Sequence, residues 1–248
     1  MVTSLTINGK PVLGGFGKGL PGSVTLNFAT SGGSNCDTAC AYHPHSTNPN
    51  ASSADARCYA AACENRHDRT QLLAKLQRHE ATDAVALIDS ATRELNRSGW
   101  RAPWFRFSAF GSVPMQVPAN FRAFVDSLRK AGIPVHLPIE SATKADTYRM
   151  ALQGIDIAVR ESVTDIHRWT MVATPMSIVA GSMTQRPAQR IVEAKRIAKA
   201  RADATGRKVI VCPAVAAMHL RTKSDKAKCG SCTACANANL DIVYPVHK

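Results

Sequence analysis

Two groups of cysteines, one toward each end of the chain, constrain the fold of this protein more than any other feature of its sequence. The carboxyl-terminal group is a lone cysteine followed by a C-x-x-C-x-x-C run: Cys212, Cys229, Cys232 and Cys235. The amino-terminal group is Cys36, Cys40, Cys58 and Cys63, and residues 64–211 contain no cysteine. A fold that brings the two ends together would therefore collect all eight thiols in one place.

The spacing of the carboxyl-terminal group favours metal ligation or redox chemistry over structural disulfides, because a C-x-x-C loop is too tight for a routine bridge. In a reducing compartment, eight cysteines also indicate metal ligands. A [4Fe–4S] cluster and a tetrahedral zinc site both take four ligands, so the four carboxyl-terminal thiols suit either one. We favour iron–sulfur, because Gly230 and Ser231 are small enough to let backbone N–H groups approach cluster sulfides.

The amino-terminal cysteines are a weaker set of ligands. Cys36, Cys40 and Cys58 are candidate metal ligands, and a single cluster that draws on both ends of the chain stays open. Free cysteines are also common as small buried apolar residues, which is the alternative for Cys40 and Cys58. His43 and His45 lie beside this group and are candidates for the metal or its surroundings.

The formal net charge of +13 predicts an attractive field for anions, whether nucleic acid, an acidic protein partner or a phosphate-bearing ligand. Much of this charge falls in residues 186–208, where a helix is expected. Its apolar residues, among them Ile191, Val192 and Ile197, can form one stripe and leave the charges on the outer face. No apolar run approaches the roughly 18 residues of a membrane span, so we expect a cytoplasmic protein with no membrane partner.

Strand-like and helix-like segments alternate along the chain. Strands are expected in residues 1–10 and at 23–29, 104–107, 134–139, 155–159, 169–173, 177–180, 208–211 and 242–244. Helices are expected within 66–97 and at 121–131, 144–152 and 186–208. This order predicts a parallel sheet in a single α/β domain over residues 1–248, as a complete or partial TIM-type barrel, with an open doubly wound sheet as the alternative. In a barrel, Cys36 and Cys212 would share the face at the strand carboxyl ends.

A few other residues are candidates for the site. Arg106 lies in an otherwise aromatic strand, where an inward arginine needs a carboxylate, a cluster or a ligand as partner. An arginine at the strand edge, pointing to solvent, is the alternative. Glu140, Lys144 and Arg160 follow or end predicted strands, whereas isolated histidines such as His136 give no useful signal.

The segment from Cys36 to His43 resembles the radical SAM loop, C-x-x-x-C-x-aromatic-C, with His43 where the third cysteine would stand. Radical SAM proteins also carry a glycine-rich turn and a carboxylate after the second strand, which hold the methionine amine. Here Gly111 keeps the glycine, and Ser112 replaces the carboxylate. The resemblance implies that Arg106 and Gly111 line the cofactor.

Over both ends the chain is similar to the phage-encoded gene product 88 family of actinobacterial viruses. The similarity rests on Cys36, R-C-Y-A at 57–60, W-F-R-F at 104–107 leading to Gly111, V-C-P at 211–213, K-C-G-S-C-T-A-C at 228–235 and V-Y-P-V-H at 243–247. It implies an altered radical SAM barrel with an iron–sulfur cluster, working in the cytoplasm of a phage host. It implies no particular reaction.

Three hypotheses follow. The leading one is a [4Fe–4S] protein on a radical-SAM-like barrel with a redox, electron-transfer or regulatory role. Its sharper form, a SAM-dependent radical enzyme, is weakened by His43 and Ser112. The alternative is a zinc-stabilised protein that binds nucleic acid through its basic surface. A third hypothesis, a regulator that docks an acidic host protein, is compatible with a phage origin.

Overall fold

A computed structural model gives the fold of the chain. The residues that it describes are 5–7, 10–12, 24–26, 28, 84–97, 99–100, 104–108, 112–163, 165–182, 184–213, 215–216, 232 and 234–245. The strands are β1 (Leu5–Ile7), β2 (Lys10–Val12), β3 (Val24–Leu26), β4 (Phe105–Phe107), β5 (Val135–Ile139), β6 (Ala158–Val163), β7 (Met176–Ala180), β8 (Lys208–Val211) and β9 (Leu240–Pro245). The helices are α3 (Ala84–Arg97), α4 (Phe121–Lys130), α5 (Ala142–Ala151), α6 (Ile166–Met171), α7 (Pro187–Thr205) and the short 3-10 helix η4 (Ala234–Ala236).

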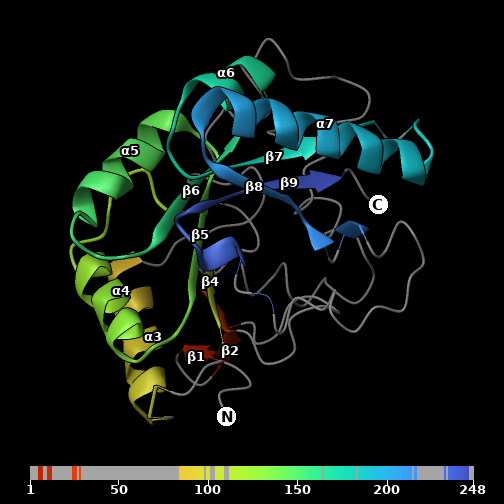
Figure 1. Ribbon diagram of the computed structural model, residues 1–248. Coiled ribbons are helices and arrows are strands. Elements are labelled where there is room, and N and C mark those ends of the chain that lie inside the picture. The colour runs from red at the N-terminus through yellow and green to blue at the C-terminus, as the bar shows by residue number, and fades with distance from the viewer. Residues whose placement is uncertain are drawn as a thin grey trace.

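The main sheet is parallel throughout. Its seven strands lie in the order β3-β4-β5-β6-β7-β9-β8, and each neighbouring pair is parallel. β1 and β2 form a separate antiparallel pair. Strand order follows the chain from β3 to β7, after which β9 lies between β7 and β8 (Figure 1).

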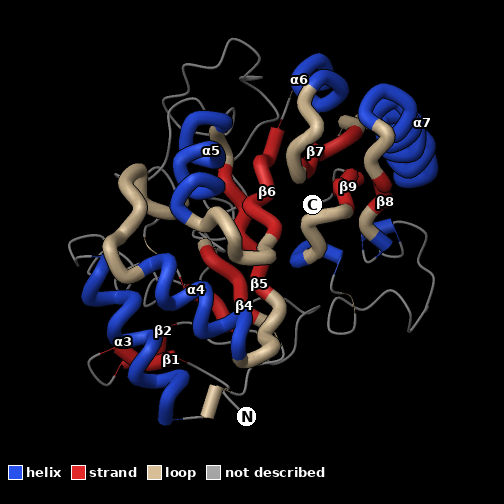
Figure 2. Tube along the Cα trace, turned by 60° about the vertical axis from the view of Figure 1, so that its left-hand side comes forward, coloured by secondary structure: helices blue, strands red, loops and turns tan. Residues whose placement is uncertain are grey.

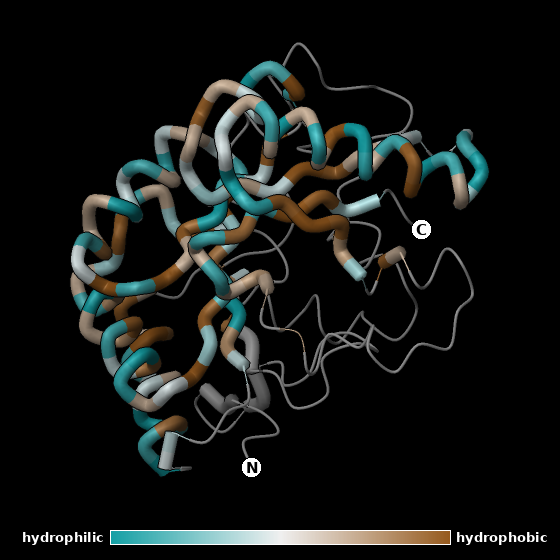
Figure 3. The backbone as a smooth tube through the Cα atoms, viewed as in Figure 1, coloured by the Kyte–Doolittle hydropathy of each residue, from teal (hydrophilic) through white to brown (hydrophobic). Residues whose placement is uncertain are grey.

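The described helices α3 to α7 form an arc on one side of this sheet (Figure 2). Phe105 and Phe107 of β4 pack against Phe121 and Phe124 of α4, with ring centroids 4.9–6.0 Å apart. At the other end of the arc, Trp169 of α6 packs with residues of β6, β7, β9 and α7 in a second apolar cluster. The hydropathy colours agree, since the hydrophobic residues gather on the strands and on the helix sides that face them (Figure 3).

The strand register divides the side chains between two faces. On β6, Val159 and Val163 pack with the helices, so Arg160, which alternates with them, faces the other way. The register pairs Pro138 with Arg160, and Arg106 with His136, so these four residues share one face. We call it the inner face, meaning the face of the sheet opposite α3 to α7.

The basic helix α7 differs from the expectation that its charges lie outward and its apolar residues inward. Arg201 is fully buried and Arg190 nearly so, whereas Val192 is 68% exposed. Two further cations are paired along the helix, Arg196 with Glu193 and Lys199 with Asp203. The outward charge of this helix is therefore smaller than the sequence suggests.

Asp241 fixes the start of β9 from the helix side. Its carboxylate accepts hydrogen bonds from Arg201 Nε at 2.6 Å, from Arg207 Nε at 2.7 Å and from the backbone N–H of Met176 at 2.8 Å. Arg201 in turn donates to the carbonyls of Trp169, Val172 and Thr174 and lies 4.4 Å from the ring centre of Trp169. Both Asp241 and Arg201 are completely buried, so the charge of each is stabilised by the opposite charge of the other.

Two of the expected strands are wrong. Residues 169–173 were expected as a strand, but most of them belong to helix α6, whose start is capped by Asp165 accepting from the N–H of His167 at 2.9 Å. The strand expected at 155–159 begins later, as β6 at Ala158, and runs through Arg160 and Glu161. These two charged residues resemble loop residues in sequence, but both are buried and paired in the structure.

The single strand expected in residues 1–10 is in the structure the antiparallel pair β1 and β2, and the other expected elements in the described ranges are confirmed within a few residues. Among the described strands, β3 and β8 are the sheet edges and do not pair with each other. The arrangement is therefore an α/β fold compatible with a partial β/α barrel, and the helices among the described residues lie on one side of the sheet, unlike those of a doubly wound sheet. Within the described ranges, no helix is long and apolar enough to cross a membrane. The helix expected in the first part of 66–97, before Ala84, lies outside the described residues.

Removing the charge of Asp241 tests this ion-pair network. Asp241→Asn should lower the free energy of unfolding by about 3 kcal/mol, because two arginines lose their buried counter-charge. The matched control is Asp203→Asn, since Asp203 pairs with Lys199 at the exposed surface and should change stability by less than about 0.5 kcal/mol. Urea unfolding followed by circular dichroism measures both, and equal stability in the two variants would contradict the assigned role.

Candidate functional site on the inner face

Arg160 anchors the segment that carries the last cysteine. Its fully buried guanidinium donates to the carbonyls of Met176 at 2.9 Å, Leu240 at 2.8 Å and Asn237 at 2.9 Å. Both Nε and Nη2 also lie 3.4 Å from the carbonyl oxygen of Cys235. Planar, forked donors suit such an array of fixed acceptors. One side chain of β6 thus holds η4 and the following turn against the inner face.

Cys235 lies in η4 and contacts the inner side of β9. Its Sγ is 3.1 Å from the hydroxyl of Tyr244, and both residues belong to a small cluster with Cys212, Val215 and Ile242. Burial raises the pKa of the Cys235 thiol, and the Tyr244 hydrogen bond and the charges of Arg160 and Arg106 oppose that rise. Burial and the neighbouring thiols of Cys235 and Cys212 raise the pKa of Tyr244 well above its usual value. Arg160 and Arg106 thus favour the thiolate form that a metal requires.

Cys212, Cys232 and Cys235 are not joined in disulfides. Cys212 follows β8 directly, where its N–H donates to the carbonyl of Val243 at 2.8 Å, and it is 8% exposed. Cys232 is close enough to Cys235 to raise its pKa. Among the described residues no three histidine, cysteine or carboxylate side chains form a group that could hold a metal ion. Cys229, the remaining member of this set, is outside the described residues.

The side chains gathered here are of the type that would bind a metal through thiolates. Cys212 and Cys235 lie in one partly buried cluster, Cys232 lies close to Cys235, and two arginines act electrostatically on Cys235. The four-cysteine ligand set itself stays a prediction.

Arg106 faces inward, as one of the two sequence alternatives proposed. It pairs in register with His136, and no carboxylate or other hydrogen-bond partner for its Nε is found in the part of the chain that the structure describes. Trp104, just before β4, is buried on the same side, with its ring centre 6.0 Å from that of His136. Burial lowers the pKa of His136 well below its usual value, and the charges of Arg106 and Arg160 lower it further. His136 is therefore neutral at pH 7.

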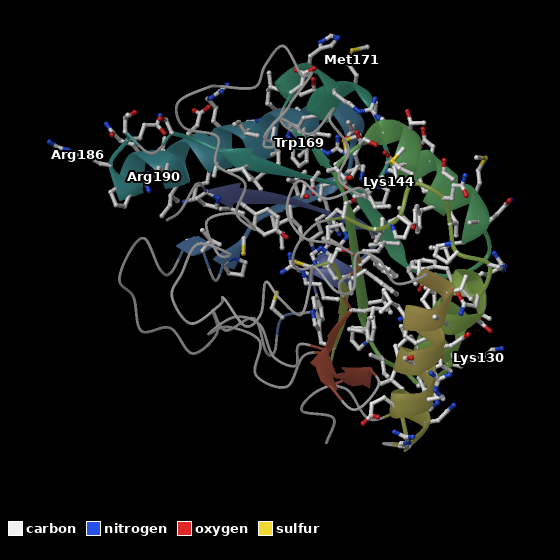
Figure 4. The ribbon with its side chains drawn as sticks, turned by 180° about the vertical axis from the view of Figure 1, so that it is seen from behind. Lys130, Lys144, Trp169, Met171, Arg186 and Arg190 are labelled. Carbon is white, nitrogen blue, oxygen red and sulfur yellow. The ribbon has the colours of Figure 1, made fainter. Side chains whose placement is uncertain are left out.

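Glu140 and Lys144 belong to a buried hydrogen-bond network after β5. Lys144 Nζ donates to Glu140 Oε1 at 2.5 Å, to Ser112 Oγ at 2.8 Å and to the carbonyl of Val113 at 3.2 Å. Ser112 Oγ donates to the second carboxylate oxygen of Glu140 at 2.5 Å. The lysine, in the first turn of α5, is 1% exposed and lies over the body of the protein in Figure 4, away from its margin. All three ammonium donors are used, so this group ties the segment after β4 to α5.

The other sequence candidates lie outside the described residues. These are Gly111 and the cysteines Cys36, Cys40, Cys58, Cys63 and Cys229, together with His43 and His45. Their assignments stay predictions. The sequence reasoning missed His136, Trp104 and Tyr244 as inner-face residues. The alternation V-H-L-P-I in β5, which sets His136 and Pro138 opposite three core residues, was the available signal for the first of these.

No protein-family model, curated protein or solved structure matches this chain. The resemblance to the phage gene product 88 family and to radical SAM proteins therefore stays a prediction from motifs.

The buried ammonium of Lys144 provides a test of the network after β5. Lys144→Met should lower the free energy of unfolding by about 3 kcal/mol, because Glu140 and Ser112 lose their shared donor. Lys130→Met is the matched control, since Lys130 also pairs with a carboxylate four residues earlier, Asp126, but is 76% exposed and projects from the margin of the protein (Figure 4). It should change stability by less than about 0.5 kcal/mol in the same urea titration. A Lys144→Met protein as stable as its control would show that the network is dispensable.

Proposed function

We propose that this protein binds a [4Fe–4S] cluster and serves in one-electron redox chemistry, as an electron carrier, a redox-responsive regulator or an altered relative of radical SAM proteins of the phage gene product 88 type. Cys212, Cys229, Cys232 and Cys235 would hold the cluster. The observation that carries the proposal is the group formed by Cys235, Tyr244 and Cys212 on the inner face, with Arg160 fixing the Cys235 backbone.

The residues around the thiols suit such a cluster. A [4Fe–4S] cluster with four thiolates is anionic, and its potential depends on net charge and on hydrogen bonds to sulfur. Arg106 and Arg160 supply positive charge near Cys235, and the Tyr244 hydroxyl is within hydrogen-bonding distance of its sulfur. When bound, the cluster would supply a site that accepts or releases one electron. The protein would supply its charge balance, its orientation and a partly buried setting.

The amino-terminal cysteines extend this proposal. If the chain forms a barrel like that of radical SAM proteins, Cys36, Cys40 and Cys58 follow its first strand and are candidates for further ligands. The sharper form is a SAM-cleaving enzyme with Arg106 and Gly111 at the cofactor. Glu140 is a poor substitute for the carboxylate that this form needs near Ser112. The Glu140 carboxylate does meet Ser112, but Lys144 and Ser112 occupy both of its oxygens.

Zinc at the same thiols, with a basic surface that binds nucleic acid or an acidic partner, is the competing proposal. The burial of Arg190 and Arg201 and the ion pairs along α7 reduce the charge that this helix presents to such partners. The exposed cations Arg186 and Lys195 remain available at its surface. Arg186 lies at the outer end of α7 and projects from the protein (Figure 4).

Metal analysis after anaerobic purification tests the proposal. We expect about four iron and four sulfide per chain and a broad absorption near ~400 nm that dithionite bleaches. Cys232→Ala should abolish the cluster, because the central cysteine of the run has no nearby substitute, whereas Cys63→Ala should retain it. A colourless protein with stoichiometric zinc would instead support the competing proposal, and equal losses in the two variants would show that the ligand set is misassigned.

A further inference from the structure

Three polar side chains meet on the inner face without satisfying one another. Trp104 Nε1 and Arg106 Nε are both buried, and neither has a hydrogen-bond partner within the described ranges. His136 lies beside both, in contact with the ring of Trp104 and in register with Arg106. Trp104 is 6% exposed and His136 is 7% exposed, so water reaches neither freely.

The N–H groups of Trp104 and Arg106 both need a hydrogen-bond acceptor. A buried N–H without an acceptor costs about 1–3 kcal/mol, and more when the group is charged. Trp104 and Arg106 can only donate, and His136 in its neutral form carries one further N–H. The electrostatic environment also favours an anion, because Arg106 and Arg160 both act on this region strongly enough to lower the pKa of His136.

We propose that Trp104, Arg106 and His136 bind the carboxylate or phosphate group of a small organic anion on the inner face, where Cys235 also lies. The guanidinium of Arg106 would pair with two oxygens of the anion, which is the geometry that its fork provides. The indole N–H of Trp104 would donate a third hydrogen bond, and its ring would shield the ion pair from water. His136 would supply the last donor.

The proposed anion site lies on the same face as Cys235, which relates it to the proposed redox centre. η4, which carries Cys235, contacts β5, which carries His136, so the anion would lie on the same face as this thiol. This inference deepens the proposed function and partly rests on it, since it makes a small carboxylate or phosphate compound the substrate or effector of the redox centre. Anion binding itself uses none of the proposed metal ligands, so it can be tested separately from metal binding.

The indole N–H signals provide a direct readout. The chain has three tryptophans. Two of them already donate within the protein, Trp100 to Asn96 Oδ1 at 2.6 Å and Trp169 to the carbonyl of Ile197 at 3.1 Å. Only the third has an unused N–H, and Trp104→Phe identifies its signal in a ¹H–¹⁵N spectrum. The other two signals are internal controls.

The test titrates the purified protein with inorganic phosphate and, separately, with succinate. We expect the Trp104 signal to move downfield and saturate, while those of Trp100 and Trp169 stay in place. The anion with the tighter binding identifies the group that the site prefers. Arg106→Gln should weaken binding by about tenfold or more, because a charged hydrogen bond is lost. Arg196→Gln, which removes the same charge from an exposed position on α7, should leave it unchanged.

Two results would overturn the proposal: a Trp104 signal that neither anion moves, or equal weakening in the Arg106→Gln and Arg196→Gln variants. Arg106→Lys guards against a folding defect, since it keeps the charge but loses the fork and should still weaken binding. The same titration in Cys232→Ala separates the two proposals. Anion binding that survives loss of the metal supports the site on its own, whereas a metal-bound protein that ignores both anions retains the proposed function and removes this inference.

Discussion

The hydrogen bonds of Arg160 determine where the last part of the chain lies. β9 lies between β7 and β8 and not at the edge of the sheet. The turn before β9 must therefore bring the chain to the start of the gap between these two strands. Arg160 holds that turn from the inner face through the carbonyls of Cys235, Asn237 and Leu240, and its fourth acceptor is the carbonyl of Met176 at the start of β7. Asp241 holds the start of β9 from the helix side. Burying an arginine without such acceptors would cost several kcal/mol. The position of Cys235 follows from this arrangement, because its own carbonyl is one of the four acceptors.

The sheet separates its charges by face. On the helix side, Glu161 and Asp241 are each paired with arginines from the helices or the following turn. On the inner face, Arg160 bonds only to carbonyls among the described residues, and Arg106 has no carboxylate partner there. The excess positive charge of the sequence is therefore not confined to a solvated helix surface. Part of it faces the thiols, where either a thiolate cluster or an anionic ligand would neutralise it.

Periodicity predicted most of the described fold, and it failed where charged residues are buried. Apolar alternation and helical spacing located β4, β5, β7, β8, α4 and α7 within a few residues. β6 was misplaced because Arg160 and Glu161 are satisfied by residues outside their own strand, Arg160 by carbonyls as distant in sequence as that of Leu240 and Glu161 by Arg168 in the following helix. α6 was read as a strand because its short apolar run has no helical period of its own, and its start depends on the Asp165 cap. The insertion of β9 between β7 and β8 depends on the same distant contacts, so no local pattern announces it.

The candidate site divides along the same line. Thiol spacing predicted Cys212, Cys232 and Cys235 as metal ligands, because a ligand set of this kind has a local signature in sequence, and that assignment stays a prediction. Trp104 and Tyr244 have no such signature, and for His136 only the alternation within β5 was available, since the role of all three depends on register across strands and on which face the helices cover. The two groups nevertheless meet through Arg106 and Arg160, whose charges reach both Cys235 and His136. An anion bound at Trp104 and a cluster bound at the cysteines would therefore sense each other's charge. The same two arginines would temper that repulsion and let an electron-rich centre and an anionic substrate occupy one face.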